Sequence, residues 1–123
     1  MTEDSVTAID QDALKALEAV LGSERTSGFI GEYIVAAQRL HGDLCQAWAV
    51  RDWDGAYRPA HNLVSNAGNF GAQKVAALAD RVQKALRQHD AETVETALEP
   101  LEAALAEAAA ELRRLYPQTE PGS

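Results

Sequence analysis

One histidine lies in a setting that favours chemistry with an anion. His61 is part of the segment AHNLVSNAGNFGA, and no Asp or Glu occurs from Gly55 to Ala79, although the chain holds 19 acidic residues among 123. The same span holds two basic residues, Arg58 and Lys74. A neutral imidazole, with an ordinary pKa of about 6.5, presents a free ring nitrogen at pH 7 that can accept a phosphoryl group. The pattern makes His61 a candidate nucleophile toward a negatively charged reactant.

A nucleophilic histidine needs one ring nitrogen protonated and the other free. If the inner nitrogen donates its proton to an acceptor on an adjacent helix, the outer nitrogen is left as the nucleophile. The alternative is a histidine that serves packing alone. On a helix, Ala60, Leu63 and Ala67 share one face, so His61 falls at the edge of that face, within reach of solvent. Its neighbours along this strip are Tyr57, Arg58, Val64, Ser65 and Gly68.

The elements that position this histidine are expected to be helices. Apolar residues recur at intervals of three and four, which predicts an all-α chain. Asp10 and Asp52 are suited to cap helices, and Gly22 to end the first one. Pro59 and Pro100 fall inside expected helices, and each is expected to kink or restart its helix because a proline removes a backbone donor. The expected helices span residues 10–22, about 23–50, 52 to about 70, about 72–88 and about 90–115.

The lengths of these helices and of their connections indicate one architecture. Short connections favour antiparallel neighbours, hence an up-down antiparallel four-helix bundle with an additional short N-terminal helix packed across one end. A chain of 123 residues is the size of one domain. The bundle is expected over residues 9–116, with disorder at residues 1–8 and in the tail, residues 117–123. Phe29 begins the expected apolar stripe of the second helix.

The composition excludes several classes of function. A formal net charge of -8 argues against nucleic acid and anionic membranes as partners, because both are bound mainly through Lys and Arg. The start of the chain, MTEDSV, has no basic or apolar targeting pattern, and no apolar run approaches the roughly 20 residues of a membrane span. These features predict a soluble, cytoplasmic protein whose partner is another protein, and we expect a monomer.

The remaining candidate residues indicate no metal or nucleotide site. No GxxxxGK[ST], CxxC or HExxH pattern occurs, and the absence of a Glu-x-x-His pair disfavours a di-iron bundle. A single cysteine, Cys45, cannot form an internal disulfide, and helical spacing places it in the core beside Leu44 and Trp48. The other histidines, His41 and His89, are expected on the surface.

The segment AHNLVSNAGNFGAQKVAALADRVQKALR resembles the signature of the histidine-containing phosphotransfer (HPt) domain family. That signature is AHxLKG, then small residues, a glycine ten after the histidine and an amphipathic helix. The resemblance extends over about Ile9 to Leu115. In this family a glutamine 22 residues after the histidine hydrogen-bonds the imidazole, and an arginine can follow four residues later, which here are Gln83 and Arg87. The residues in register are Ala60, His61, Leu63, Gly71, Leu78 and Ala79.

The resemblance implies a phosphocarrier of a multistep phosphorelay and not a complete enzyme. It implies partners that are response-regulator receiver domains or a hybrid histidine kinase. The receiver brings Mg²⁺, so the chain is expected to have no cofactor of its own. His61 would be the phosphoacceptor, Gln83 would orient the imidazole, and Arg58 and Arg87 would support its charge. The receiver docking surface would include Tyr57, Val64, Ser65 and Gly68.

Three positions depart from the family pattern. Val64 and Ser65 stand where the family usually has lysine and glycine, and Pro59 is unexpected so close to the histidine. Arg58, one turn earlier on the same strip, could replace the charge of the missing lysine. These departures leave two alternatives open: a degenerate HPt-fold module that docks receivers or inhibits them without being phosphorylated, and a helical scaffold or dimerising bundle with no receiver partner.

Overall fold

The chain is all-helical in this computed structural model, which describes residues 9–117. Those residues form five helices and no strand, which confirms that this part of the chain is all-α. The disorder expected at residues 1–8 and 118–123 falls outside the described residues. The helices are α1 (Gln11–Leu21), α2 (Ser23–Ala49), α3 (Trp53–Asn69), α4 (Gln73–Arg87) and α5 (Ala91–Leu115).

Aspartates determine where three of the helices begin. The side chain of Asp10 accepts a hydrogen bond from the Asp12 backbone N–H at the start of α1, and Asp52 accepts from Gly55 at the start of α3. Asp90 caps α5 in the same way. Such a cap satisfies a backbone donor that the first turn of a helix leaves unpaired. The expected caps Asp10 and Asp52 are therefore confirmed, and so is Gly22, which ends α1 with a φ of 86°.

The prolines do not restart their helices. Both α3 and α5 run without a break through Pro59 and Pro100, so of the two outcomes expected there, a kink or a restart, the restart does not occur. A proline deprives its helix of one hydrogen bond, while packing against neighbouring helices supplies most helical stability in a folded protein. Pro59 is itself buried in that packing, whereas Pro100 is exposed.

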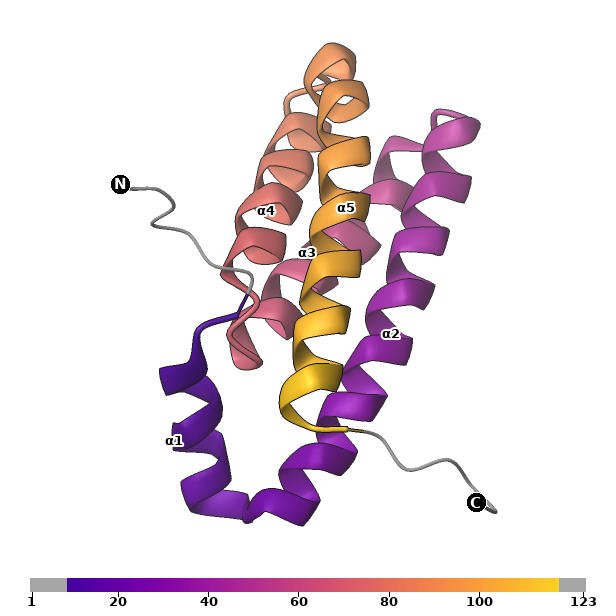
Figure 1. The fold of residues 1–123 in the computed structure, drawn as a ribbon. Helices are drawn as coiled ribbons and strands as arrows, with labels where there is room; N and C mark the ends of the chain where they lie inside the picture. Colours follow the sequence, from indigo (N-terminus) through magenta and orange to yellow (C-terminus); the bar gives the residue numbers. More distant parts are fainter. Residues whose placement is uncertain (1–8, 118–123) are drawn as a thin grey trace.

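The four longer helices lie side by side (Figure 1). Helix α3 packs between α2 and α4, α5 packs on both α4 and α2, and α1 packs on α2. The core between them contains many alanines, which allow the helices to approach closely. In α3 the completely buried residues include Ala60, Leu63 and Ala67, as the expected core face of that helix requires.

Two side chains expected in the core lie elsewhere. Phe29 is 44% exposed, although Thr26, Ile30 and Tyr33 on the same stretch of α2 are buried, so Phe29 lies at the edge of the buried face of this helix. Cys45 is half-buried at the margin of the core, while Leu44 and Trp48 fill the interior positions beside it. The Cys45 Sγ lies 3.6 Å from Nε2 of His41, which is also half-buried and not a fully exposed residue.

Gly71 joins the segment before α1 to the connection between α3 and α4. Its carbonyl accepts a hydrogen bond of 2.7 Å from the backbone N–H of Asp10. Gly71 has a φ of +73°, and a Cβ there would lie 2.6 Å from the Asp10 carbonyl oxygen. This position therefore requires glycine for both its backbone conformation and its close contact.

Candidate functional site

Helix α3 presents His61 to solvent from a well-anchored backbone. Its neighbours Ala60 and Leu63 are completely buried, while the His61 side chain is exposed. The arrangement follows from the helical period, which turns residue 61 to the edge of the face formed by Ala60, Leu63 and Ala67. The backbone of the histidine is thus held by core packing, and its ring projects from the surface.

The imidazole of His61 is held by a glutamine of the next helix. His61 Nδ1 and Gln83 Oε1 are 2.9 Å apart. Because an amide oxygen only accepts, Nδ1 carries the proton and donates it. The other ring nitrogen, Nε2, has no hydrogen-bond partner among the described residues. The site therefore presents a nitrogen lone pair to solvent on a ring whose orientation is fixed from α4.

Gln83 belongs to a polar network that the sequence reasoning did not identify. Its Nε2 donates to Asp80 Oδ1 at 2.7 Å, and Asp80 Oδ2 accepts from Lys84 Nζ at 2.9 Å. The hydrogen bond from Lys84, followed by that from Gln83, holds the pKa of the Asp80 carboxyl below its ordinary value. The available signal was spacing: residues three and four apart on a helix meet on its surface, so Asp80 can reach both Gln83 and Lys84.

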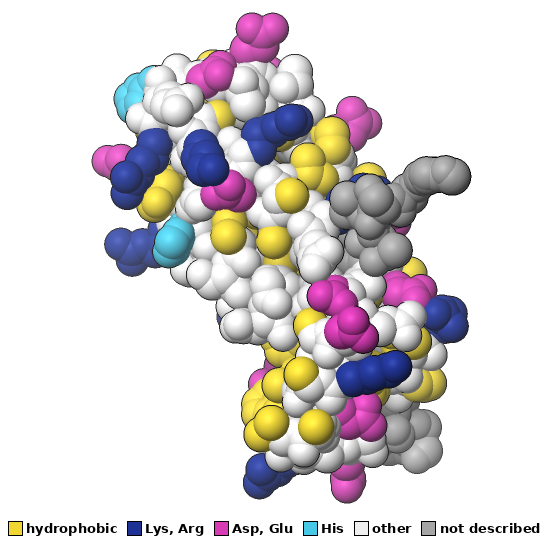
Figure 2. All heavy atoms as spheres, turned by 90° about the vertical axis from the view of Figure 1, so that its left-hand side faces the viewer, with side chains coloured by type: hydrophobic (Ala, Val, Ile, Leu, Met, Phe, Trp, Pro, Cys, Tyr) yellow, Lys and Arg dark blue, Asp and Glu magenta, His cyan; other side chains and the backbone are white. Residues whose placement is uncertain are grey.

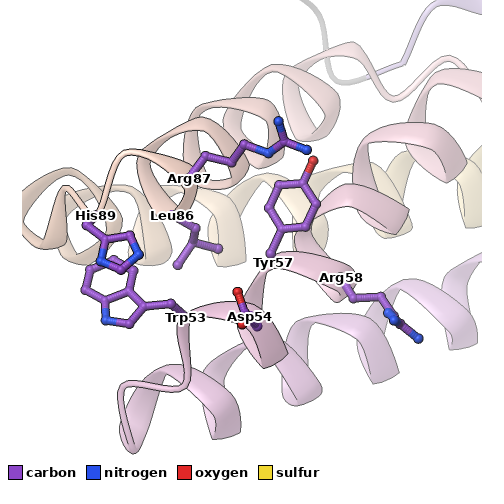
Figure 3. Close-up of a pocket in the computed structure, with 7 residues that line it drawn as sticks. All are labelled: Trp53, Asp54, Tyr57, Arg58, Leu86, Arg87 and His89. Carbon is purple, nitrogen blue, oxygen red and sulfur yellow. The ribbon is translucent and has the colours of Figure 1, made fainter.

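Tyr57 lies against the His61 ring one turn earlier on α3. The two rings are nearly parallel, at 13°, with centroids 5.8 Å apart. The Arg87 guanidinium is 5.0 Å from the centroid of the Tyr57 ring, in the geometry of a cation–π contact. Arg58 extends to the opposite side of Tyr57 (Figure 3). Neither arginine has a carboxylate within ion-pair distance among residues 9–117.

A cavity of about 360 Å³ adjoins this aromatic side of the site (Figure 3). On its far side the rings of Trp53 and His89 are stacked, 4.3 Å apart. The exposed His89 side chain agrees with the surface position expected for it. Lys and Arg side chains gather with histidines on the upper part of one face of the molecule (Figure 2). The cavity is lined by Trp53, Asp54, Tyr57, Arg58, Leu86, Arg87 and His89.

The other predicted contact residues continue along α3 past the histidine. Val64 is half-buried and packs against the core. Its apolar side chain brings no charge to the site. Ser65 and Gly68 are exposed. A Cβ at Gly68 would meet no atom within 4 Å, which shows that the surface is open there. The strip beside His61 is therefore small and accessible.

The described residues hold neither a cluster of metal ligands nor a helix that could cross a membrane. No group of three or more His, Cys, Asp and Glu side chains within residues 9–117 could hold a metal ion. In the same part of the chain, none of the helices has the length and apolar character needed to cross a membrane.

Comparisons with known proteins identify the family of this chain and a structure with the same fold. The model of the Hpt domain matches residues 28–115, so the chain belongs to the Hpt domain family, and the resemblance seen in the sequence is confirmed. The structure is similar to the crystal structure of histidine-containing phosphotransfer protein B (HptB) from Pseudomonas aeruginosa PAO1, with a TM-score of 0.87. The match covers 94% of this chain and 100% of that chain at 16% identity, which shows a shared fold. No curated protein sequence matches the chain.

Proposed function

We propose that this chain is a histidine phosphotransfer protein of a multistep phosphorelay. His61 receives a phosphoryl group from the aspartyl phosphate of one response-regulator receiver domain, free or part of a hybrid histidine kinase, and gives it to an aspartate of another. The supporting frame is an up-down antiparallel four-helix bundle with α1 as its additional N-terminal helix. The observation that carries the proposal is the exposed His61 ring, with Nδ1 2.9 Å from Gln83 Oε1 and Nε2 left free.

The transfer step uses this arrangement directly. The Nε2 lone pair attacks phosphorus in line with the bond to the aspartyl oxygen. An N–P bond forms, the O–P bond breaks, and the aspartate leaves as a carboxylate. The ring keeps its Nδ1 proton and becomes positively charged, and the Gln83 oxygen stabilises that charge through the same hydrogen bond. The return step reverses these changes onto the aspartate of the second receiver.

The chain contributes positioning, and the receiver contributes most of the remaining groups. Phosphoryl transfer depends mainly on alignment and on neutralising charge at the phosphoryl oxygens. We assign the charge neutralisation on this side to Arg58 and Arg87, and the Mg²⁺ to the receiver. The chain then acts as a phosphocarrier without a cofactor of its own. It works as a monomer in the cytoplasm, where its receivers are found.

The receiver docks around the exposed imidazole in this proposal. Tyr57 and Val64 supply apolar surface on either side of His61, while Ser65 and Gly68 let the receiver approach closely. The unfilled surface at Gly68 supports this assignment.

One observation favours a second candidate function. Val64 replaces the lysine that the family usually has three residues after the histidine, and its half-buried side chain supplies no charge. A chain weakened in this way could dock receivers, or inhibit them, without becoming phosphorylated.

Labelled phosphate distinguishes the two functions. The purified chain is incubated with a panel of phosphorylated receiver domains, alongside His61→Gln and the matched variant His89→Gln. The carrier predicts acid-labile, alkali-stable label on the wild type and on His89→Gln, and none on His61→Gln. Receivers that bind without labelling the wild type would instead establish the docking module, and labelled His61→Gln would remove His61 as the acceptor.

A further inference from the structure

The side chain of a glutamine can present either of two chemical faces to a histidine. Its amide oxygen accepts a hydrogen bond and its amide nitrogen donates one, and a half-turn of the amide exchanges them. If Gln83 offered its nitrogen to His61, the imidazole Nδ1 would have to accept, and its proton would move to Nε2. The nucleophilic nitrogen would then be blocked, so the orientation of the amide matters as much as its position.

Asp80 removes this ambiguity. A carboxylate has only acceptor atoms, so the amide atom that faces Asp80 Oδ1 at 2.7 Å must be the nitrogen of Gln83. The oxygen of the same amide then faces His61 Nδ1. The three side chains form one directed chain of hydrogen bonds, in which His61 donates to Gln83 and Gln83 donates to Asp80.

Lys84 allows a carboxylate to serve in this place. An anion close to the phosphoryl-accepting ring would repel a negatively charged reactant, and Asp80 is the first acidic residue after the gap that begins at Gly55. Lys84 Nζ lies 2.9 Å from Asp80 Oδ2 and offsets its charge. The hydrogen bonds from Lys84 and Gln83 also hold the pKa of Asp80 low, so the group is an ionised acceptor near neutral pH.

We propose that Asp80 is a positioning residue that orients the Gln83 amide and thereby selects the Nδ1–H form of His61. It touches neither the imidazole nor a reactant, and it acts through Gln83. Its consequence for the transfer rate rests on the proposed phosphocarrier function, whereas its effect on the tautomer does not. The two can therefore be tested separately.

The direct test measures the tautomer of His61 by long-range ¹⁵N–¹H NMR. Spectra are recorded for the unphosphorylated chain at a pH where titration shows the ring neutral in each variant. We expect the Nδ1–H form in the wild type. In Asp80→Ala we expect the ratio of the two tautomers to move by about fivefold toward Nε2–H, the size of one net hydrogen bond. As a matched control, Glu107→Ala breaks the ion pair between Glu107 of α5 and Lys74 of α4. This variant should leave the tautomer ratio of His61 unchanged.

A second background tests the route of the effect. Gln83→Ala removes the amide through which Asp80 is proposed to act. In that background, Asp80→Ala should leave the tautomer ratio unchanged. Thermal unfolding of every variant confirms that it is folded. The proposal is overturned if Asp80→Ala keeps the wild-type ratio, or if it shifts the ratio equally in the Gln83→Ala background.

The labelling rate links this residue to the proposed function. We expect receivers to label Asp80→Ala about fivefold more slowly than the wild type and than Glu107→Ala. A tautomer shift in a chain that no receiver labels would support the role of Asp80 and reject the phosphocarrier. A labelled wild type together with an unchanged tautomer in Asp80→Ala would support the phosphocarrier and reject the role of Asp80.

Discussion

His61 and His89 are both exposed imidazoles beside an aromatic ring, yet their surroundings differ in kind. His89 is stacked on Trp53 with centroids 4.3 Å apart, closer than the 5.8 Å between His61 and Tyr57. Of these two histidines, only His61 has a side-chain hydrogen bond to a ring nitrogen among the described residues. A stacked ring restricts the plane of an imidazole but does not choose which nitrogen carries the proton. The comparison teaches that a polar partner, and not burial or stacking, distinguishes the candidate site.

Removing that polar partner should have the largest effect. In Gln83→Ala, His61 keeps its exposure and its contact with Tyr57 but loses the acceptor for Nδ1. A hydrogen bond to a charged group contributes about 1.5–3 kcal/mol, so labelling by a phosphorylated receiver should slow by about 10- to 100-fold. Initial rates measured at equal concentrations of folded protein test this. An unchanged labelling rate would show that the hydrogen bond to Gln83 is not what distinguishes His61 from His89.

Breaking the other stack should affect stability and leave the transfer intact. Trp53→Ala removes a half-buried ring that contacts both Trp48 and His89. We expect the free energy of unfolding to fall by about 2 kcal/mol, less than for a fully buried aromatic residue. Urea denaturation measures this loss. His89→Ala is the control and should cost less than about 0.5 kcal/mol, as at other surface positions. A slower labelling rate per folded Trp53→Ala molecule would contradict the separation of the two regions.

The helix that carries both Trp53 and His61 depends on the cap at its start. A Cβ at Gly55 would lie 2.2 Å from Asp52 Oδ2, so Gly55→Ala displaces the capping side chain. The lost cap costs about 1 kcal/mol and cancels the gain that alanine ordinarily brings to a helix. Gly42→Ala, where the new methyl group would meet nothing within 4 Å, should stabilise the chain by about 0.5–1 kcal/mol. Equal stabilisation by both substitutions, measured by denaturation, would show that the Asp52 cap contributes little.

The smallest effect is expected at Tyr57. Tyr57→Leu removes the ring between His61 and Arg87, and the loss of one exposed cation–π contact should slow labelling by about two- to fivefold. Tyr57→Phe keeps the ring and should transfer at nearly the wild-type rate. If the two variants slow equally, the phenol hydroxyl and not the ring is what the site uses.

The predictable parts of the structure are those that depend on neighbours along the chain. The caps at Asp10 and Asp52 and the glycine end of α1 follow from residues a few positions apart, and all three are confirmed. Phe29 was placed wrongly because an apolar residue at the edge of the stripe of α2 has the same spacing as those at its centre, and only the packing shows which of them are covered. At Pro59, where a kink or a restart was expected, α3 does not restart, because packing between α2 and α4 maintains the helix through the missing hydrogen bond.

The candidate site likewise has residues that the sequence predicts and residues whose roles depend on how the helices pack. His61 and Gln83 were proposed from the sequence, and the structure brings their side chains together. Asp80 was missed, although it lies only three residues before Gln83. Its role depends on which amide atom faces α3, and that is decided only when two helices meet. The direction of Arg58, away from Arg87 across Tyr57, likewise depends on side-chain rotamers that residue spacing cannot give (Figure 3).

The hydrogen bond between Asp10 and Gly71 has a consequence for how the molecule opens. It joins segments far apart in sequence, and α1 lies outside the residues that match the family. Helix α1 packs chiefly on α2, so it can detach as a unit while α3 and α4 remain paired. We expect the Asp10 amide proton to exchange with solvent earlier than the amides of Ala60 and Leu63. Opening of the N-terminal end is then an event of lower free energy than exposure of the helix that carries His61.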